Sequence, residues 1–153
     1  MSAYRIQYTQ FLPISLETAW DFFSSPDNLR EITPAYMNFR ILSRAGGEKM
    51  FPGQIITYKV SPIPFISMFW MTEITHVAPL QYFIDEQRFG PYDLWHHRHE
   101  FKAVEGGVEM LDEVHYKIPL GPLGQLANWL FVRRQLEGIF EYRKRVLEEK
   151  WVK

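Results

Sequence analysis

The chain has 153 residues, with 17 Lys and Arg against 18 Asp and Glu, which gives a formal net charge of −1 at pH 7. It contains no cysteine, so disulfides, thiolate zinc sites and cysteine nucleophiles are excluded. The near-zero charge argues against a nucleic-acid-binding protein. Aromatic residues make up 16% of the chain, more bulky rings than a tight core of this size needs, so we expect a cavity.

The N-terminal part is expected to form one strand and two short helices. Polar and apolar residues alternate from Tyr4 to about Phe11, a pattern that predicts a half-buried strand. Ser15 suits the N-cap of a short helix with an apolar stripe. A second short helix is expected to begin near Pro26 and to stop before Pro34, because the residue before a proline avoids the α conformation.

No segment has the features of a targeting signal or a membrane span. The N-terminal residues lack the basic start and the apolar run of a secretory signal. The longest apolar stretch, residues 60–71, contains two prolines and is shorter than the ~20 residues that cross a bilayer. We therefore expect a cytoplasmic protein without a transmembrane segment.

The middle and the end of the chain are expected to form a sheet and a long helix. Six strands fit between Asn38 and Lys117, separated by turn signals such as Gly46-Gly47 and Gly106-Gly107. From Gly121 onward the apolar residues follow a helical period. This order predicts an α+β domain in which a curved antiparallel sheet of about seven strands wraps around the C-terminal helix.

Two groups of residues carry a family resemblance over nearly the whole chain. The first is the segment from Pro13 to Trp20 with Thr33-Pro34 after it. The second comprises Asp85, Gln87, Gly90-Pro91-Tyr92, Trp95, His97, His99, Phe101, Asp112, Tyr116, Pro119, Gly121 and residues 139–143. With the order of elements, they resemble the START-like superfamily, also called SRPBCC, which has the helix-grip fold. The second group looks like a bacterial subfamily of unestablished function, some members of which are fused to a nucleotide-sugar-epimerase-like domain labelled a cell-division inhibitor.

The resemblance implies a scaffold that holds a small hydrophobic ligand of the lipid, quinone or polyketide type. The superfamily includes pollen allergens, lipid-transfer domains, polyketide cyclases and coenzyme-Q-binding proteins. It supplies no catalytic residues that can be transferred to this sequence.

The strand expected at residues 95–102 places two histidines in the interior. Alternation puts His96, Arg98, Glu100 and Lys102 on the solvent face, so the interior face carries Trp95, His97, His99 and Phe101. Buried histidines among apolar groups need polar partners.

The neighbouring strands are expected to supply those partners. Hairpin turns at Gly90-Pro91 and Glu105-Gly106 set a register in which Gln87 faces His97, and Asp85 faces His99. His99 in turn lies near Asp112. Asp85, His99 and Asp112 then form one cross-strand row.

Three interpretations of this row remain open. The first is a purely structural network that neutralises buried charge. The second is recognition of the polar end of an otherwise apolar ligand. In the third, His99 and Asp85 are a catalytic acid/base pair, or His97 and His99 hold a divalent metal with a carboxylate. No third histidine is obviously placed, so we expect no metal and no cofactor.

The expected ligand-binding residues combine this row with aromatic and apolar groups that strand parity and helix periodicity turn inward. Arg143 is included because it lies close to the apolar stripe of the helix and could reach a carboxylate. The full set is Tyr58, Trp70, Asp85, Gln87, Trp95, His97, His99, Phe101, Asp112, Tyr116, Leu130, Phe140 and Arg143.

The segment from Pro62 to Trp70 carries apolar residues where a hairpin tip is normally polar. It could be a lid, a homodimer contact or a membrane-docking tip. Lys59 is the one basic residue nearby, which places membrane docking behind the other two roles.

These observations predict one START-like ligand-binding domain over residues 1–153. We expect it to bind a small hydrophobic molecule between the sheet and the C-terminal helix, and to bind no nucleic acid. The first alternative is a cyclase- or dehydratase-like enzyme that uses His99 with Asp85. The second is a scaffold that acts through protein contacts and has a filled interior.

Overall fold

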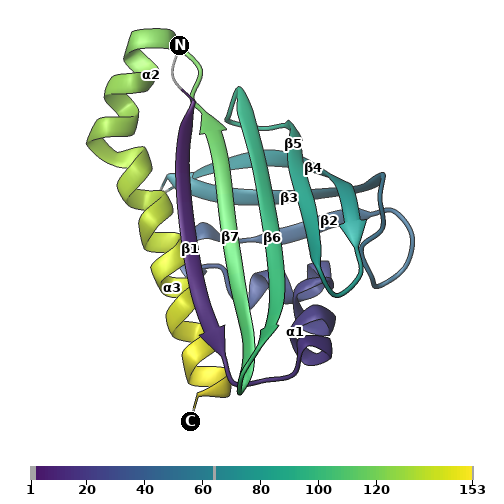
Figure 1. Cartoon of the computed structure of the whole chain (residues 1–153). Helices are drawn as coiled ribbons and strands as arrows, with labels where there is room; N and C mark the ends of the chain where they lie inside the picture. Colours follow the sequence, from purple (N-terminus) through teal and green to yellow (C-terminus); the bar gives the residue numbers. More distant parts are fainter. Residues whose placement is uncertain (1–2, 64, 153) are drawn as a thin grey trace.

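The computed structural model describes residues 3–63 and 65–152, which form a curved seven-stranded antiparallel sheet around a long C-terminal helix (Figure 1). The strands are β1 (Tyr4–Leu12), β2 (Arg40–Arg44), β3 (Gln54–Ile63), β4 (Ile66–Ala78), β5 (Tyr82–Phe89), β6 (Leu94–Val104) and β7 (Gly107–Lys117). Their order across the sheet is β1-β7-β6-β5-β4-β3-β2. The expected fold class is therefore confirmed.

Short helices follow β1 and lie beneath the sheet. Helix α1 (Leu16–Phe23) begins as expected, since the Ser15 hydroxyl accepts a hydrogen bond of 3.1 Å from the Thr18 amide. The second helix is shorter than expected and forms the 3₁₀ turn η1 (Pro26–Arg30), and a further 3₁₀ turn, η2 (Ala35–Met37), follows Pro34. Hydrogen bonds between residues three apart tighten this stretch.

The C-terminal helix is divided by a π turn. Helix α2 (Gly121–Ala127) leads into the π turn η3 (Asn128–Val132), and α3 (Arg133–Trp151) follows. The expectation that Leu126 and Leu130 face the interior is wrong, because both are at least half exposed. A π turn holds one residue more than an α turn, so side chains before it are rotated away from the face that α3 turns to the sheet.

Hydrophobic clusters fill the space between sheet and helices except in its middle. One cluster joins α1 to β6 and β7 around Phe23 and Phe101. A second joins β1 and β7 to α3, and a third covers β3 and β4 with η2. Each fully buried large apolar side chain contributes about 1.5–3 kcal/mol.

The segment from Pro62 to Trp70 is the tip of the β3–β4 hairpin. Strand pairing extends to Ile63, which lies opposite Ile66, and Trp70 lies opposite Tyr58 further down the hairpin. Pro64 lies outside the described residues. The apolar character of this tip therefore belongs to paired strands and not to a loose connection.

Candidate functional site

The pairing of β5, β6 and β7 brings the interior histidines and aspartates together. His99 lies opposite Asp112, as the sequence predicts. The expected pairing of β5 with β6 is wrong by two residues, since Asp85 lies opposite His97. A shift of two residues keeps each side chain on its own face, so both histidines still point into the interior.

The Gln87 side chain is bonded within the β5–β6 connection in the observed register. Its side-chain amide donates a hydrogen bond of 2.6 Å to the Tyr92 carbonyl and accepts one of 3.1 Å from the Tyr92 amide. These two bonds hold the β5–β6 connection closed. Gln87 therefore stabilises a turn and does not lie beside His97.

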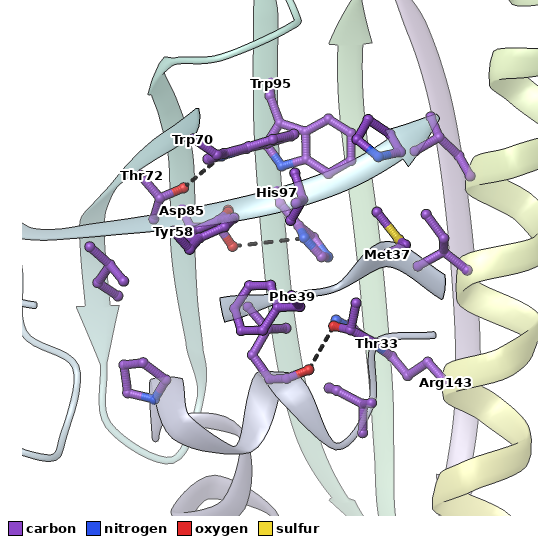
Figure 2. A pocket seen from close by; sticks show the side chains of 18 of the residues that line it. Thr33, Met37, Phe39, Tyr58, Trp70, Thr72, Asp85, Trp95, His97 and Arg143 are labelled. Carbon is purple, nitrogen blue, oxygen red and sulfur yellow. Dashed lines mark hydrogen bonds and ion pairs between the residues drawn. The ribbon is translucent and has the colours of Figure 1, made fainter. Parts of the chain in front are cut away.

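Asp85, His97, His99, Asp112 and Arg143 form one buried group, called here the polar cluster. His97 Nε2 lies 2.8 Å from Asp112 Oδ1, and His99 Nε2 lies 2.7 Å from Asp85 Oδ2. An ionised carboxylate only accepts, so each histidine nitrogen donates. His97 Nδ1 is 3.7 Å from Asp85 Oδ2, a contact drawn in Figure 2. The two imidazole rings lie close together, with centroids 3.7 Å apart and planes tilted by 32°.

Arg143 joins the polar cluster from α3. Its Nη1 donates a hydrogen bond of 3.0 Å to Asp112 Oδ1, and the side chains of Arg143 and Asp112 are only 8% and 3% exposed. His99 Nδ1 also lies 2.9 Å from Asp112 Oδ1, but without the alignment of a hydrogen bond. Arg143 Nε is buried and has no hydrogen-bond partner among the described residues.

Both aspartates in the polar cluster favour the ionised form. Burial raises the pKa of the Asp112 carboxyl, but the Arg143 charge, the hydrogen bond from His97 and the close contact with His99 outweigh it, so this pKa lies well below its ordinary value. Burial acts in the same way on Asp85. There the hydrogen bond from His99 and the nearby positive charges lower the pKa by more than burial raises it.

The two histidines have pKa values displaced in opposite directions. Burial and the charge of His99 lower the pKa of His97 by more than its contacts with Asp112 and Asp85 raise it. Burial also lowers the pKa of His99, but the close contact with the Asp112 carboxylate and the hydrogen bond to Asp85 raise it by more. These directions favour a neutral His97 and a protonated His99. With His99 protonated, the cluster, Arg143 included, holds two positive and two negative charges.

A cavity of about 310 Å³ separates the sheet from α3 and the 3₁₀ turns (Figure 2). Its walls are aromatic and apolar, and Tyr58 stacks on Trp70 with ring centroids 5.9 Å apart. The indole of Trp70 donates a hydrogen bond of 3.3 Å to the Thr72 hydroxyl. One part of the lining is charged and consists of Asp85, His97, His99 and Arg143.

The sequence-predicted site residues divide into two sets in the structure. Those that line the cavity are Tyr58, Trp70, Asp85, Trp95, His97, His99, Phe140 and Arg143. Those that do not are Gln87, Phe101, Asp112, Tyr116 and Leu130. Asp112 lies behind both histidines, Phe101 packs in the cluster with α1, and Tyr116 donates a hydrogen bond of 2.7 Å to Asn128 at the π turn.

Several lining residues had no sequence signal. Met37 and Phe39 reach the cavity from η2 and the segment after it, and Phe131 and Gln135 reach it from the C-terminal helix. Their positions depend on how the 3₁₀ turns and the π turn are oriented against the sheet. Residue spacing along the chain does not reveal that orientation.

Asp85, His97 and His99 also offer a set of metal ligands. One atom from each lies within 4.8 Å of the others, which matches the two-histidine, one-carboxylate pattern of some metal sites. His99 Nε2 already donates to Asp85, so a metal ion would have to displace this proton.

Among residues 3–63 and 65–152, no helix is long and apolar enough to cross a membrane. The cytoplasmic location stays a prediction from the sequence.

Comparisons with known proteins identify the fold. No protein-family model and no curated protein matches the sequence. An uncharacterised protein from Rhizobium leguminosarum superposes with a TM-score of 0.69 at 15% identity, covering 97% of this chain and 96% of the other. Ara h 8.0201 superposes with a TM-score of 0.59 at 14% identity, covering 97% and 99%.

A third similar structure is the nucleoside-diphosphate sugar epimerase from Corynebacterium glutamicum, with a TM-score of 0.66 at 20% identity. The match covers 94% of this chain but only 28% of the epimerase. At these identities the comparisons show the fold alone. Since Ara h 8.0201 has the helix-grip fold, this chain has it as well.

Proposed function

We propose that residues 1–153 form one START-like domain that binds a small hydrophobic molecule in the cavity between the sheet and α3. One observation carries this proposal: an apolar cavity of about 310 Å³ ends in the buried polar cluster. Small-molecule sites are typically apolar pockets of roughly 300–1,000 Å³ with a few converging polar groups. Lipids, quinones and polyketides have the matching chemistry.

The polar cluster favours a neutral ligand oxygen as the group it recognises. Arg143 Nε is a buried donor without a partner among the described residues, and Arg143 lines the cavity. A buried donor gains from an acceptor on the ligand. With His99 protonated the cluster charges balance, so a carbonyl or hydroxyl adds no uncompensated buried charge, whereas a carboxylate would.

Binding of a neutral fluorescent probe tests the proposal. 1-N-phenylnaphthylamine should bind the wild-type protein with an increase in emission. Ile56→Phe, a substitution of a buried cavity residue in β3, should weaken this binding at least tenfold by filling the cavity.

Ile6→Phe is the matched control. Ile6 is equally buried in a strand but does not line the cavity, so its variant should bind the probe like the wild type. Equal binding by the wild type and both variants would place the probe elsewhere and argue for a scaffold without an internal ligand.

A second candidate function is a cyclase- or dehydratase-like enzyme in the same cavity. The pair of His99 and Asp85 at 2.7 Å supports it. Titratable groups with pKa values displaced in opposite directions, such as His97 and His99, are also typical of acid/base sites. In this function His99 is the acid and His97 the base.

Molecules extracted from freshly purified wild-type and His99→Gln proteins distinguish the two functions. A binding protein should yield the same compound from both, identified by native mass spectrometry and organic extraction. An enzyme should yield product from the wild type and substrate from the variant, differing by one water for a dehydratase and by isomeric structure for a cyclase.

A further inference from the structure

The cavity opens between the tip of the β3–β4 hairpin and the π turn. Among the described residues that line it, only Ile63 and Phe131 are exposed, at 46% and 51%. A side chain that both lines a cavity and meets solvent lies at its opening. The Gln135 amide, which donates a hydrogen bond to the Pro62 carbonyl, joins the two sides of this opening.

The surface around the opening is apolar on both sides. On the hairpin, Phe65 is fully exposed and Ile66 is half exposed. On the helical side Trp129 is 79% exposed, and Leu126 and Leu130 are also exposed. A contiguous patch of exposed apolar side chains marks an interaction site. We call these residues, with Ile63 and Phe131, the opening patch.

The segments that carry the opening patch have one sign of charge. Residues 54–72 and 118–136 contain Lys59, Arg133 and Arg134 and no Asp or Glu, although the whole chain has 18 acidic residues. Arg133 pairs with Glu137 at 3.0 Å. Lys59 and Arg134 are exposed and have no carboxylate within ion-pair distance among the described residues. The opening patch is thus apolar with a basic border.

We propose that the opening patch docks on the surface of a lipid bilayer that contains anionic lipids. Exposed Trp and Phe side chains insert at the boundary between headgroups and acyl chains, and basic residues beside them pair with anionic headgroups. A second copy of this chain fits the patch less well, because a two-fold contact would bring the same cations together with no carboxylate to pair with them.

The structure also explains what docking would achieve. A cavity whose opening faces the acyl region exchanges a hydrophobic ligand without exposing it to water. This purpose rests on the proposed function, whereas docking itself does not. Vesicle binding and probe binding are measured separately, so either can fail alone.

Vesicle flotation tests the docking. The wild-type protein should float with vesicles of phosphatidylcholine and phosphatidylglycerol, and less with phosphatidylcholine alone. Phe65→Ser and Trp129→Ser should each lower the partition coefficient about tenfold or more, because each removes a large apolar group from the bilayer contact. Arg134→Gln should lower it about fivefold on the anionic vesicles only.

Phe11→Ser is the matched control. Phe11 is half exposed and lies near the C-terminal end of β1, which is far from α2 and the opening (Figure 1). Its variant should therefore partition like the wild type. All substituted side chains are exposed, which keeps the variants folded.

Absence of vesicle binding by the wild type would overturn the proposal, as would equal losses for Phe11→Ser and Phe65→Ser. A dimer in sedimentation velocity that Phe65→Ser dissociates, without vesicle binding, would assign the opening patch to a second copy instead.

Discussion

Replacing Asp112 by asparagine should destabilise the protein strongly, because Asp112 links the sheet to α3. The carboxylate accepts hydrogen bonds from Arg143 Nη1 at 3.0 Å and from His97 Nε2 at 2.8 Å. The Oδ1 of an asparagine has two lone pairs and can still accept both hydrogen bonds. It carries no charge, however, so the buried Arg143 loses the carboxylate with which it pairs, and Asp85 is the one negative charge left in the cluster.

The magnitude follows from burial. Arg143 and Asp112 are 8% and 3% exposed, so water screens their attraction little. Breaking a buried ion pair from one side costs roughly 3–5 kcal/mol, a large share of the roughly 5–15 kcal/mol that stabilises a typical domain. For a chain of 153 residues this corresponds to a decrease in Tm of roughly 6–20 °C.

Urea unfolding followed by tryptophan fluorescence at pH 7 measures the loss. Arg143→Met should cost a similar amount, since it leaves Asp112 without its cation. The double variant Asp112→Asn with Arg143→Met should lose less than the sum of the two single losses, because neither charge is then left alone. A loss below about 1 kcal/mol for Asp112→Asn, the range of exposed ion pairs, would refute the reasoning.

The remaining predictions concern the pH dependence of the free energy of unfolding. The folded pKa of His99 is raised, so its stabilisation is complete below the unfolded value of 6.5 and is lost as pH rises through the folded value. Wild-type stability should therefore fall above pH 6.5, and His99→Gln should flatten this part of the curve in urea titrations. The folded pKa of His97 is lowered, so protonation of the unfolded chain should reduce stability as pH falls below 6.5. His97→Gln should remove that decrease, and an unchanged curve in either variant would contradict the assigned charge states.

Strand parity made the interior position of His97 and His99 predictable from the sequence. Side chains alternate along a strand with a period of two, and a polar outer face leaves one choice for the inner one. The tight Glu105-Gly106 turn likewise made the position of His99 opposite Asp112 predictable. The pairing of Asp85 was predicted two residues away, because the hydrogen bonds of Gln87 that close the longer β5–β6 connection have no local signature.

The C-terminal helix shows where periodicity fails. Apolar spacing predicts one continuous stripe, but the π turn at residues 128–132 rotates Leu126 and Leu130 outward. The same rotation places apolar side chains beside the hairpin tip. From the sequence alone, Lys59 was the only basic residue expected near that tip. Arg133 and Arg134 join it only in three dimensions, since about seventy residues separate them along the chain.

The polar cluster and the opening patch lie on different residues, so their effects should separate. Arg143 ties α3 to β7 in the interior, whereas Phe65 and Trp129 contribute surface that the folded core does not use. Asp112→Asn should therefore lower the free energy of unfolding while leaving the partition into anionic vesicles within about twofold of the wild type at a temperature where both remain folded. Phe65→Ser should do the reverse, with a stability change within about 0.5 kcal/mol. If Asp112→Asn instead reduced vesicle binding as much as Phe65→Ser does, the opening would depend on how α3 is held against the sheet, and the patch could not be treated as a preformed surface.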